Sequence, residues 1–293
     1  MGDLVFISGD FSSGTTLLYT LFRGNQECRC LYEPLHETLL PWLVWSPRSY
    51  EGHVNVGNYF REYKGLGGVM RLADPSWGVS GLHLDEADEA PGLRRYLSYL
   101  IGASYAYAPR VVVKENRLTF RLAWLRANFP QARVINIWRD KEDQWRSWVR
   151  RSQQYLGRED VGQGSVEFMG FRLAAWCEDL KSTFPELSAD ASTSGFERFS
   201  KLWELSREAH ERHADLCINL REFHDDFDAA LARVSRASGI ALDADELRHL
   251  MAPERRRASA QVPRRRGLRL VDRAGLRYAE TRVRLQRRRI GPN

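Results

Sequence analysis

The residues with the clearest chemical meaning form a loop of glycine and hydroxyl side chains near the N-terminus. Residues 4–8 are an apolar, strand-like run, and residues 9–16 (Gly-Asp-Phe-Ser-Ser-Gly-Thr-Thr) lead from it into an apolar helix start at Leu17. Glycines at positions 9 and 14 permit a tight turn, and successive N–H groups at a helix N-terminus point at an anion. We therefore predict that residues 9–16 bind a phosphate group.

This loop has the spacing of the nucleotide-binding motif GxxxxGK[ST], with one difference. Thr15 stands at the position of the lysine that ATP- and GTP-hydrolysing proteins need. Glycine- and serine-rich loops between a strand and a helix are also common without a ligand. The loop by itself leaves both interpretations open.

A second strand-to-helix junction follows residues 132–138, which have the composition of a buried strand. Arg139, Asp140, Asp143 and Ser147 come next at the spacing RDxxDxxxS. Here the chain resembles the sulfotransferases that use 3'-phosphoadenosine 5'-phosphosulfate (PAPS), whose motif is RDPxDxxxS. The resemblance implies that Arg139 and Ser147 hold the 3'-phosphate of PAPS.

The first loop resembles the [KR]SGT[TS] motif of the same family. Ser13, Gly14, Thr15 and Thr16 match this motif, and Ser12 takes the place of its basic residue. The resemblance implies that these five residues bind the phosphosulfate group of PAPS.

Because Ser12 is neutral, an active enzyme needs another cation in the same space. A charged hydrogen bond is about twice as strong as a neutral one, so its loss in a dry site is costly. We expect Lys114 to supply this cation, with Arg71 or an arginine of the C-terminal segment as the second choice.

Three further segments resemble the family in the expected order. Residues 31–34 (Leu-Tyr-Glu-Pro) resemble the YEP segment of carbohydrate-type sulfotransferases, residues 111–114 resemble a central strand that ends in lysine, and residues 218–243 resemble a C-terminal family segment. The resemblance implies a catalytic role for Glu33.

In-line sulfuryl transfer depends on positioning and on stabilisation of charge. The leaving phosphate gains charge, so a cation has to meet it, and Lys114 is the candidate. The acceptor hydroxyl loses a proton, which requires a base within hydrogen-bond reach. Glu33 is the predicted base, and His36 and Glu37 are competitors in the same turn.

Length and composition predict one globular, soluble chain. The 293 residues, 43% of them hydrophobic, are enough for a large core. The N-terminus enters the first strand directly, and no apolar run approaches the roughly 18 residues of a membrane span, so we expect a cytoplasmic protein with no membrane partner. The four cysteines have no metal-binding pattern, and we predict packing thiols and no metal.

The net charge of +6 is concentrated near the C-terminus. Residues 254–289 contain fourteen arginines and three acidic residues, so the rest of the chain is net negative. This segment is either a solvated tail or, less favoured, an arm that binds nucleic acid. Residues 264–267 resemble the RKG element of cytosolic sulfotransferases, which implies that Arg265, Arg266 and Gly267 contact the 3'-phosphate.

Alternating strands and helices predict a three-layer α/β/α fold around a central parallel sheet, with ligands beyond the carboxyl ends of the strands. We expect one domain over residues 1–293, with insertions at 38–92 and 157–195 that form an acceptor lid. Strands are expected at 3–8, 29–32, 110–114, 132–138 and 215–220, and helices at 16–24, 93–107, 117–128, 141–156, 168–184, 196–213, 226–238 and 244–251.

The resulting functional hypothesis is a PAPS-dependent sulfotransferase. Its acceptor is a hydroxyl, less favourably an amine, of a carbohydrate or a hydroxylated natural product. Two alternatives remain open: a P-loop small-molecule kinase or other nucleotide-dependent transferase that holds magnesium with Asp140, and a non-catalytic scaffold or nucleic-acid-binding protein acting through the arginine-rich segment.

Overall fold

The computed structural model describes residues 3–45, 60–157, 166–168, 171–188 and 193–248. The arginine-rich segment 254–289 therefore lies outside the described residues, together with the predicted contacts of Arg265, Arg266 and Gly267. Parts of the two predicted insertions also lie outside them.

A five-stranded sheet forms the centre of the molecule, and all of its strand pairs are parallel. Its strands are near-continuous apolar runs, which fits a sheet covered on both faces. This confirms the predicted strands to within one residue at each end. In sheet order they are β2 (Cys28–Tyr32), β3 (Arg110–Lys114), β1 (Leu4–Ser8), β4 (Arg133–Trp138) and β7 (Leu216–Asn219).

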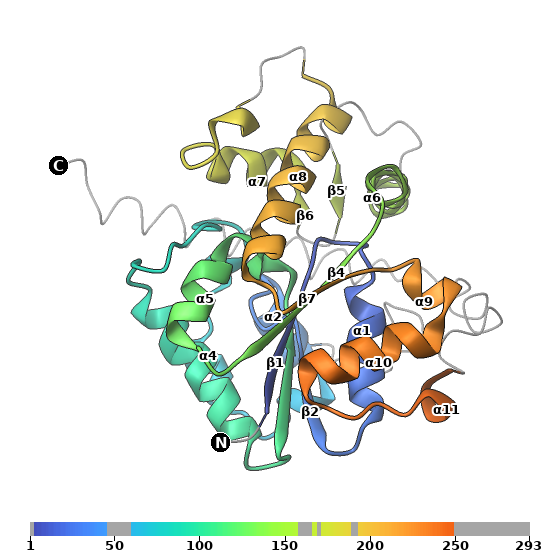
Figure 1. Ribbon diagram of the computed structural model, residues 1–293. Coiled ribbons are helices and arrows are strands. Elements are labelled where there is room, and N and C mark those ends of the chain that lie inside the picture. The colour runs from blue at the N-terminus through green and yellow to red at the C-terminus, as the bar shows by residue number, and fades with distance from the viewer. Residues whose placement is uncertain (1–2, 46–59, 158–165, 169–170, 189–192, 249–293) are drawn as a thin grey trace.

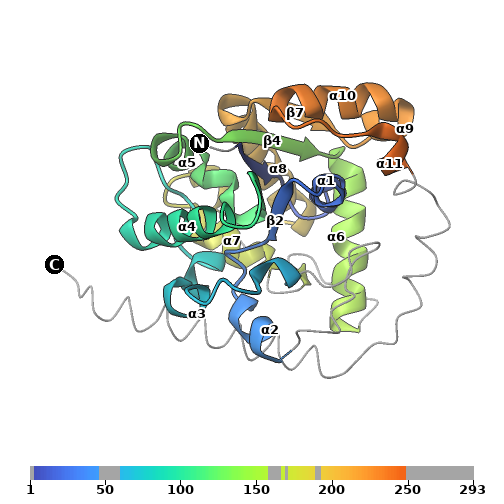
Figure 2. The ribbon, with the colours of Figure 1, turned by 90° about the horizontal axis from the view of Figure 1, so that it is seen from below.

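Helices cover the two faces of the sheet and complete the predicted three layers (Figure 1). α1 and α10 lie on one face, and α4, α5 and α8 lie on the other. α6 leaves the end of β4 and stands beside the layers, as Figure 2 also shows. The helices are α1 (Thr15–Gly24), α2 (Leu39–Trp45), α3 (Val69–Leu72), α4 (Pro91–Ser104), α5 (Leu122–Asn128), α6 (Lys141–Leu156), α7 (Leu173–Leu180), α8 (Gly195–His213), α9 (Glu222–Asp225), α10 (Phe227–Ser238) and α11 (Ala244–Leu247).

Two of the predicted helices begin later than expected. Residues 168–184 were expected to be helical, but β5 (Glu167–Phe168) pairs antiparallel with β6 (Phe171–Arg172) before α7 starts at Leu173. Residues 116–121 form a 3₁₀ helix, η3, and α5 follows it. In η3 the buried Arg121 side chain donates hydrogen bonds to the backbone carbonyls of residues 77, 80 and 81, a tertiary contact that local periodicity does not reveal.

The described part of the predicted insertion 38–92 belongs to the main core. Besides α2 and α3 it contains the short 3₁₀ helices η1 (Arg61–Tyr63) and η2 (Pro75–Gly78). Its buried side chains include Leu39, Trp42, Tyr63 and Val69, which pack with the sheet residues.

A second hydrophobic cluster lies beyond the carboxyl edge of the sheet, where β5, β6 and α7 are found in Figure 1. Phe11 belongs to residues 9–16, which we call the phosphate loop after their predicted ligand. Its ring inserts into this cluster, with ring centroids 4.8 Å from Phe171 and 5.5 Å from Trp176. The side chains of Gln144 and Trp148 on α6 donate hydrogen bonds to the Phe11 carbonyl. The loop is thus anchored through its one large apolar residue.

Within the described residues, no helix is long and apolar enough to cross a membrane.

A substitution at Gly9 tests how closely the loop after β1 packs against β4. A Cβ atom at position 9 would lie 2.5 Å from the backbone carbonyl oxygen of Ile137, which belongs to a central strand and cannot move aside. We expect Gly9→Ala to destabilise the fold by about 1–3 kcal/mol, the usual range for overpacking. The measurement is chemical unfolding followed by circular dichroism.

Gly102→Ala is the matched control, because a Cβ atom on this exposed turn of α4 meets nothing within 4 Å. It should be neutral or stabilise by about 0.5–1 kcal/mol through helix propensity. Equal unfolding free energies for the two variants would contradict the close approach at Gly9.

Candidate active site

Three loops that follow neighbouring strands meet at the carboxyl edge of the sheet. In the pairing register Lys114, the last residue of β3, lies opposite Ile7 of β1 and Tyr32 of β2. The phosphate loop after β1, the turn 33–38 after β2 and residues 115–117 after β3 therefore start side by side. The fold brings Glu33, Lys114 and residues 9–16 together, as their positions at strand ends predicted.

The phosphate loop has the backbone conformation that its sequence suggests. Gly14 caps α1 with φ 114°, and Ser12 also adopts a left-handed conformation with φ 65°. A non-glycine residue held in this region costs about 1–3 kcal/mol and is typical of functional sites. The hydroxyl oxygens of Ser12 and Ser13 are buried and have no hydrogen-bond partner among the described residues.

The two threonines of the loop contact the neighbouring strand ends. The Thr15 hydroxyl donates to Oδ1 of Asn116 at 3.2 Å, and Oγ1 of Thr16 lies 3.4 Å from the Tyr32 hydroxyl. The loop is thus connected to the residues that follow β3 and to the end of β2.

A buried ionic cluster lies beside the loop. Lys114 donates to Oε1 of Glu33, and Arg117 reaches Oε2 of the same carboxylate at 3.1 Å. Arg117 also binds Oε2 of Glu37 through Nη2 at 2.7 Å and Nε at 3.1 Å. Glu33 itself has φ 44°, a second left-handed non-glycine residue at this edge.

The cluster contains more carboxylates than cations. Burial raises the pKa of Glu37 to about 7, because Arg117 only partly compensates for the loss of water. Burial acts in the same direction on Glu33, but Lys114 and Arg117 outweigh it and hold the pKa of Glu33 well below its ordinary value. Glu115, the third carboxylate, has a pKa raised by burial. At neutral pH the cluster therefore keeps Glu33 ionised.

His36 is held next to Glu33 in one tautomer. Its Nδ1 accepts the backbone N–H of Thr38 at 3.1 Å, so in the neutral ring the hydrogen is on Nε2. Nε2 lies 3.8 Å from Oε2 of Glu33, and Nδ1 lies 3.6 Å from Oε1 of Glu37. The imidazole of His36 thus lies next to both carboxylates.

The junction after β4 presents the guanidinium of Arg139. Arg139 is half-buried, and its side chain makes no hydrogen bond or ion pair with the described residues. Asp140, in contrast, accepts from Nδ2 of Asn219 at 3.0 Å and pairs with Arg221 at 2.7 Å.

The other motif residues of this junction lie on α6. Ser147 is buried on this helix. Lys141, where the family has proline, begins α6 and pairs with Glu204 on the surface.

Three polar residues of this region were not predicted from the sequence. Asn116 and Arg117 come two and three residues after Lys114, and their position after a predicted strand was the available signal. Asp10, inside the loop, accepts a hydrogen bond from Ser206 at 2.8 Å, and burial raises its pKa to about 7 against that bond and the charge of Arg207. Asp10 therefore links the loop to α8.

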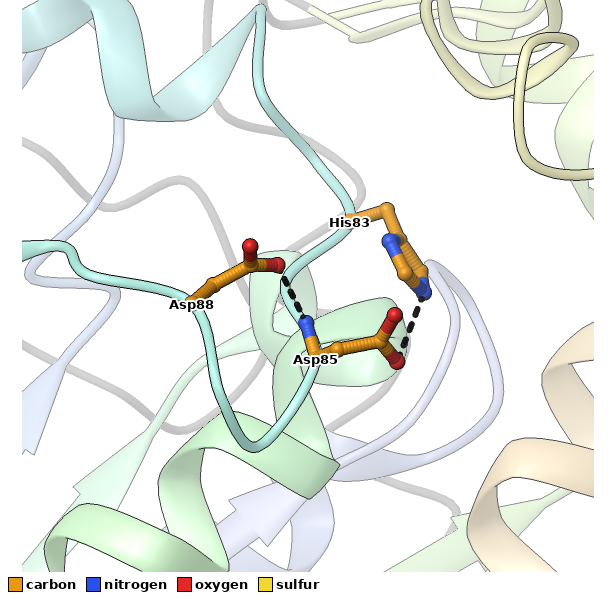
Figure 3. Close-up of side chains that lie close together, drawn as sticks. All are labelled: His83, Asp85 and Asp88. Carbon is orange, nitrogen blue, oxygen red and sulfur yellow. Dashed lines mark hydrogen bonds and ion pairs between the residues drawn. The ribbon is translucent and has the colours of Figure 1, made fainter.

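Among the described residues, His83, Asp85 and Asp88 form a group of potential metal ligands on the loop before α4 (Figure 3). Asp88 accepts the backbone N–H of Asp85, and His83 lies 3.5 Å from the Asp85 carboxylate, which is 70% exposed. A turn between exposed side chains accounts for this arrangement.

A parallel sheet whose strand ends carry a phosphate loop, an ionic pair and a second basic junction is the framework of enzymes that bind phosphorylated ligands. A family model described as "Sulfotransferase family" matches residues 4–190, which include the loop, Glu33, Lys114 and Arg139. The chain belongs to the sulfotransferase family.

Three solved structures that are similar to this chain are described as sulfotransferases. The sulfotransferase domain from the curacin biosynthetic pathway is 14% identical, with TM-score 0.45, over 87% of this chain and 80% of that chain. STF9 from Mycobacterium avium is 16% identical, with TM-score 0.43, over 90% and 69% of the two chains. STF1 from Mycobacterium tuberculosis is 19% identical, with TM-score 0.40, over 87% and 72%. A search of curated proteins found no match.

Arg117 tests the ionic cluster. Its guanidinium is fully buried between two carboxylates, and removing one member of a buried ion pair costs about 3–5 kcal/mol. We expect Arg117→Met to lower the unfolding free energy by this amount near neutral pH. Lys114 still lowers the pKa of Glu33 in the variant, but by less than Lys114 and Arg117 together. Acid therefore removes less stability from the variant than from the wild type, and the deficit narrows as the pH falls below the ordinary pKa of a glutamate.

The control is Arg61→Met, because Arg61 pairs with Glu62 while its own side chain is 72% exposed. Its effect should stay within about 0.5 kcal/mol at every pH. Urea unfolding at several pH values measures both variants. A deficit in Arg117→Met that is independent of pH would show that lost packing, and not charge, is the cause.

Proposed function

We propose that this protein transfers the sulfuryl group of PAPS to a hydroxyl, less favourably an amine, of a carbohydrate or hydroxylated natural product. The observation that carries the proposal is the meeting of three features at one sheet edge: the phosphate loop, the carboxylate of Glu33 and the ammonium group of Lys114. Each corresponds to a role that sulfuryl transfer requires.

The proposed donor site uses both strand-to-helix junctions. The phosphosulfate lies on the loop, with Ser12, Ser13, Gly14, Thr15 and Thr16 around it. The hydroxyl oxygens of Ser12 and Ser13 support this placement, because they are buried without a partner among the described residues and buried polar groups are almost always hydrogen-bonded. No metal ion is required in this scheme.

The 3'-phosphate is assigned to Arg139 and Ser147. Support comes from the guanidinium of Arg139, which has no partner among the described residues, and from its place at the N-terminus of α6. Arg265, Arg266 and Gly267 remain the second proposal for the same phosphate.

Glu33 is the proposed base and Lys114 the proposed cation for the leaving phosphate. The lowered pKa keeps Glu33 in the carboxylate form that a base needs, but two bound cations also make it weakly basic. Charge that builds on the leaving phosphate attracts Lys114, and Glu33 then loses part of its stabilisation and becomes more basic. His36 remains the alternative base.

Family membership favours sulfuryl transfer over the two alternatives. Asp140, the proposed magnesium ligand of a kinase, is occupied by Asn219 and Arg221. The proposal that the chain binds nucleic acid depends on residues 254–289, outside the described part.

Donor binding tests the assignment of PAPS directly. We expect adenosine 3',5'-bisphosphate (PAP) to raise the melting temperature clearly more than ADP or AMP, because only PAP carries a 3'-phosphate for Arg139. Ligand at about 100 times its dissociation constant stabilises the fold by about 2.7 kcal/mol. Arg139→Ala should weaken PAP binding by about 1.5–3 kcal/mol, measured by calorimetry.

The matched control for this experiment is Arg95→Ala, an exposed arginine on α4. It should bind PAP like the wild type. Equal shifts with PAP, ADP and AMP would remove PAPS as donor, and unchanged affinity in Arg139→Ala would move the 3'-phosphate to Arg265 and Arg266.

The rate of turnover tests whether Glu33 is the general base. We expect Glu33→Gln to bind PAP normally and to release PAP from PAPS about 100- to 10,000-fold more slowly in the presence of an accepted hydroxyl compound, because the amide keeps the shape and removes the basicity. Glu27→Gln, on an exposed residue, is the control. Near-normal turnover in Glu33→Gln would transfer the role to His36 or Glu37, and His36→Ala would then distinguish them.

A further inference from the structure

Asn116 occupies a constrained position between the phosphate loop and the ionic cluster. It follows β3 by two residues and its side chain is 3% exposed. The adjacent Glu115 carboxylate fixes this turn by accepting the backbone N–H groups of Arg117 at 2.9 Å and Leu35 at 2.6 Å. The backbone that carries Asn116 is therefore held from both sides.

The amide of Asn116 is oriented by the loop itself. Its Oδ1 accepts the Thr15 hydroxyl at 3.2 Å, and its Nδ2 group donates to no described residue. The Nδ2 atom keeps some contact with solvent, unlike the fully buried hydroxyl oxygens of Ser12 and Ser13, which also have no partner among the described residues. Its N–H groups are therefore available to a ligand oxygen beside the loop.

We propose that Asn116 is a catalytic residue that donates hydrogen bonds from Nδ2 to the sulfuryl oxygens of PAPS during transfer. With Lys114 it supplies the stabilisation that relatives obtain from a basic residue at the position of Ser12. This inference rests on the proposed function and adds a residue to it.

The chemistry of the step is balanced without a further reactant. The bond between sulfur and the phosphate oxygen breaks, and its electron pair leaves with PAP. The bond between sulfur and the acceptor oxygen forms, and the acceptor proton passes to Glu33. Charge on the sulfuryl oxygens is spread during this exchange, so a neutral, pre-oriented donor in a water-poor site stabilises it without carrying a full charge.

Lys114 and Arg117 lie at the same edge as Ser12, and the guanidinium carbon of Arg117 lies 5.3 Å from the ring centre of Phe11, the residue before Ser12. The neutral amide of Asn116 adds hydrogen-bond donors to this space without adding a charge.

The test measures PAP affinity and sulfuryl transfer separately. PAP has no sulfuryl group, so Asn116→Ala should bind PAP within about threefold of the wild type. Transfer from saturating PAPS, followed as PAP release to water or to an accepted hydroxyl compound, should fall about 100- to 1,000-fold, the range for loss of one such donor.

Asn116→Asp separates catalysis from support of the loop. The aspartate keeps the oxygen that accepts the Thr15 hydroxyl but replaces the N–H groups by an oxygen that repels the sulfuryl group. We expect transfer at saturating PAPS to be at least as slow as in Asn116→Ala. If Asn116→Asp transfers at close to the wild-type rate, Asn116 only supports Thr15 and the inference is wrong.

Asn128→Ala is the matched control, since this asparagine lies at the end of α5 and donates to the Trp124 carbonyl. It should leave both readouts unchanged. Wild-type transfer in Asn116→Ala, or equal losses of PAP affinity and transfer, contradicts the inference alone. Absence of PAP and PAPS binding by the wild type removes the proposed function, and the inference with it.

Discussion

The sharing of Glu33 between Lys114 and Arg117 is the interaction on which the candidate site depends. It joins the turn after β2 to the residues after β3, and Arg117 extends it to Glu37. Removing charges from water costs several kcal/mol for each ion, so a buried ion pair is weak as a source of stability. The cluster is better explained by what it positions: a carboxylate kept ionised and an ammonium group beside the phosphate loop.

The phosphate loop depends on contacts from outside the sheet as well. Phe11 is held among aromatic side chains of β6, α6 and α7, and Asp10 is connected to α8 through Ser206. A second polar chain lies behind it, where the hydroxyl of Ser8 contacts His210 at 2.9 Å. Burial lowers the pKa of His210 to about 4, so this histidine is neutral at physiological pH. The left-handed conformation of Ser12 persists because its neighbours are fixed on both sides.

The two strand-to-helix junctions differ in their contacts among the described residues. At the first, the hydroxyl oxygens of Ser12 and Ser13 are buried without a partner in the described part of the chain. At the second, Arg139 is half-buried and its side chain makes no hydrogen bond or ion pair with a described residue. Under the proposed function, the first junction excludes water from the reacting phosphosulfate and the second anchors the 3'-phosphate.

Local sequence determined the strands, the glycine-rich loop and the placement of Glu33 and Lys114 at the same edge of the sheet. Continuous apolar runs and glycines at fixed spacing act over a few residues, and the carboxyl ends of parallel strands must lie on the same side of a sheet. The tertiary structure alone decided the strand order, which places Asn116 against Thr15 and Arg117 against Glu37, some 80 to 100 residues away in the chain. It also decided the β5–β6 pair, where aromatic packing around Phe11 replaced the expected helix. These contacts depend on packing between segments that are distant in the chain, so a local sequence pattern does not predict them.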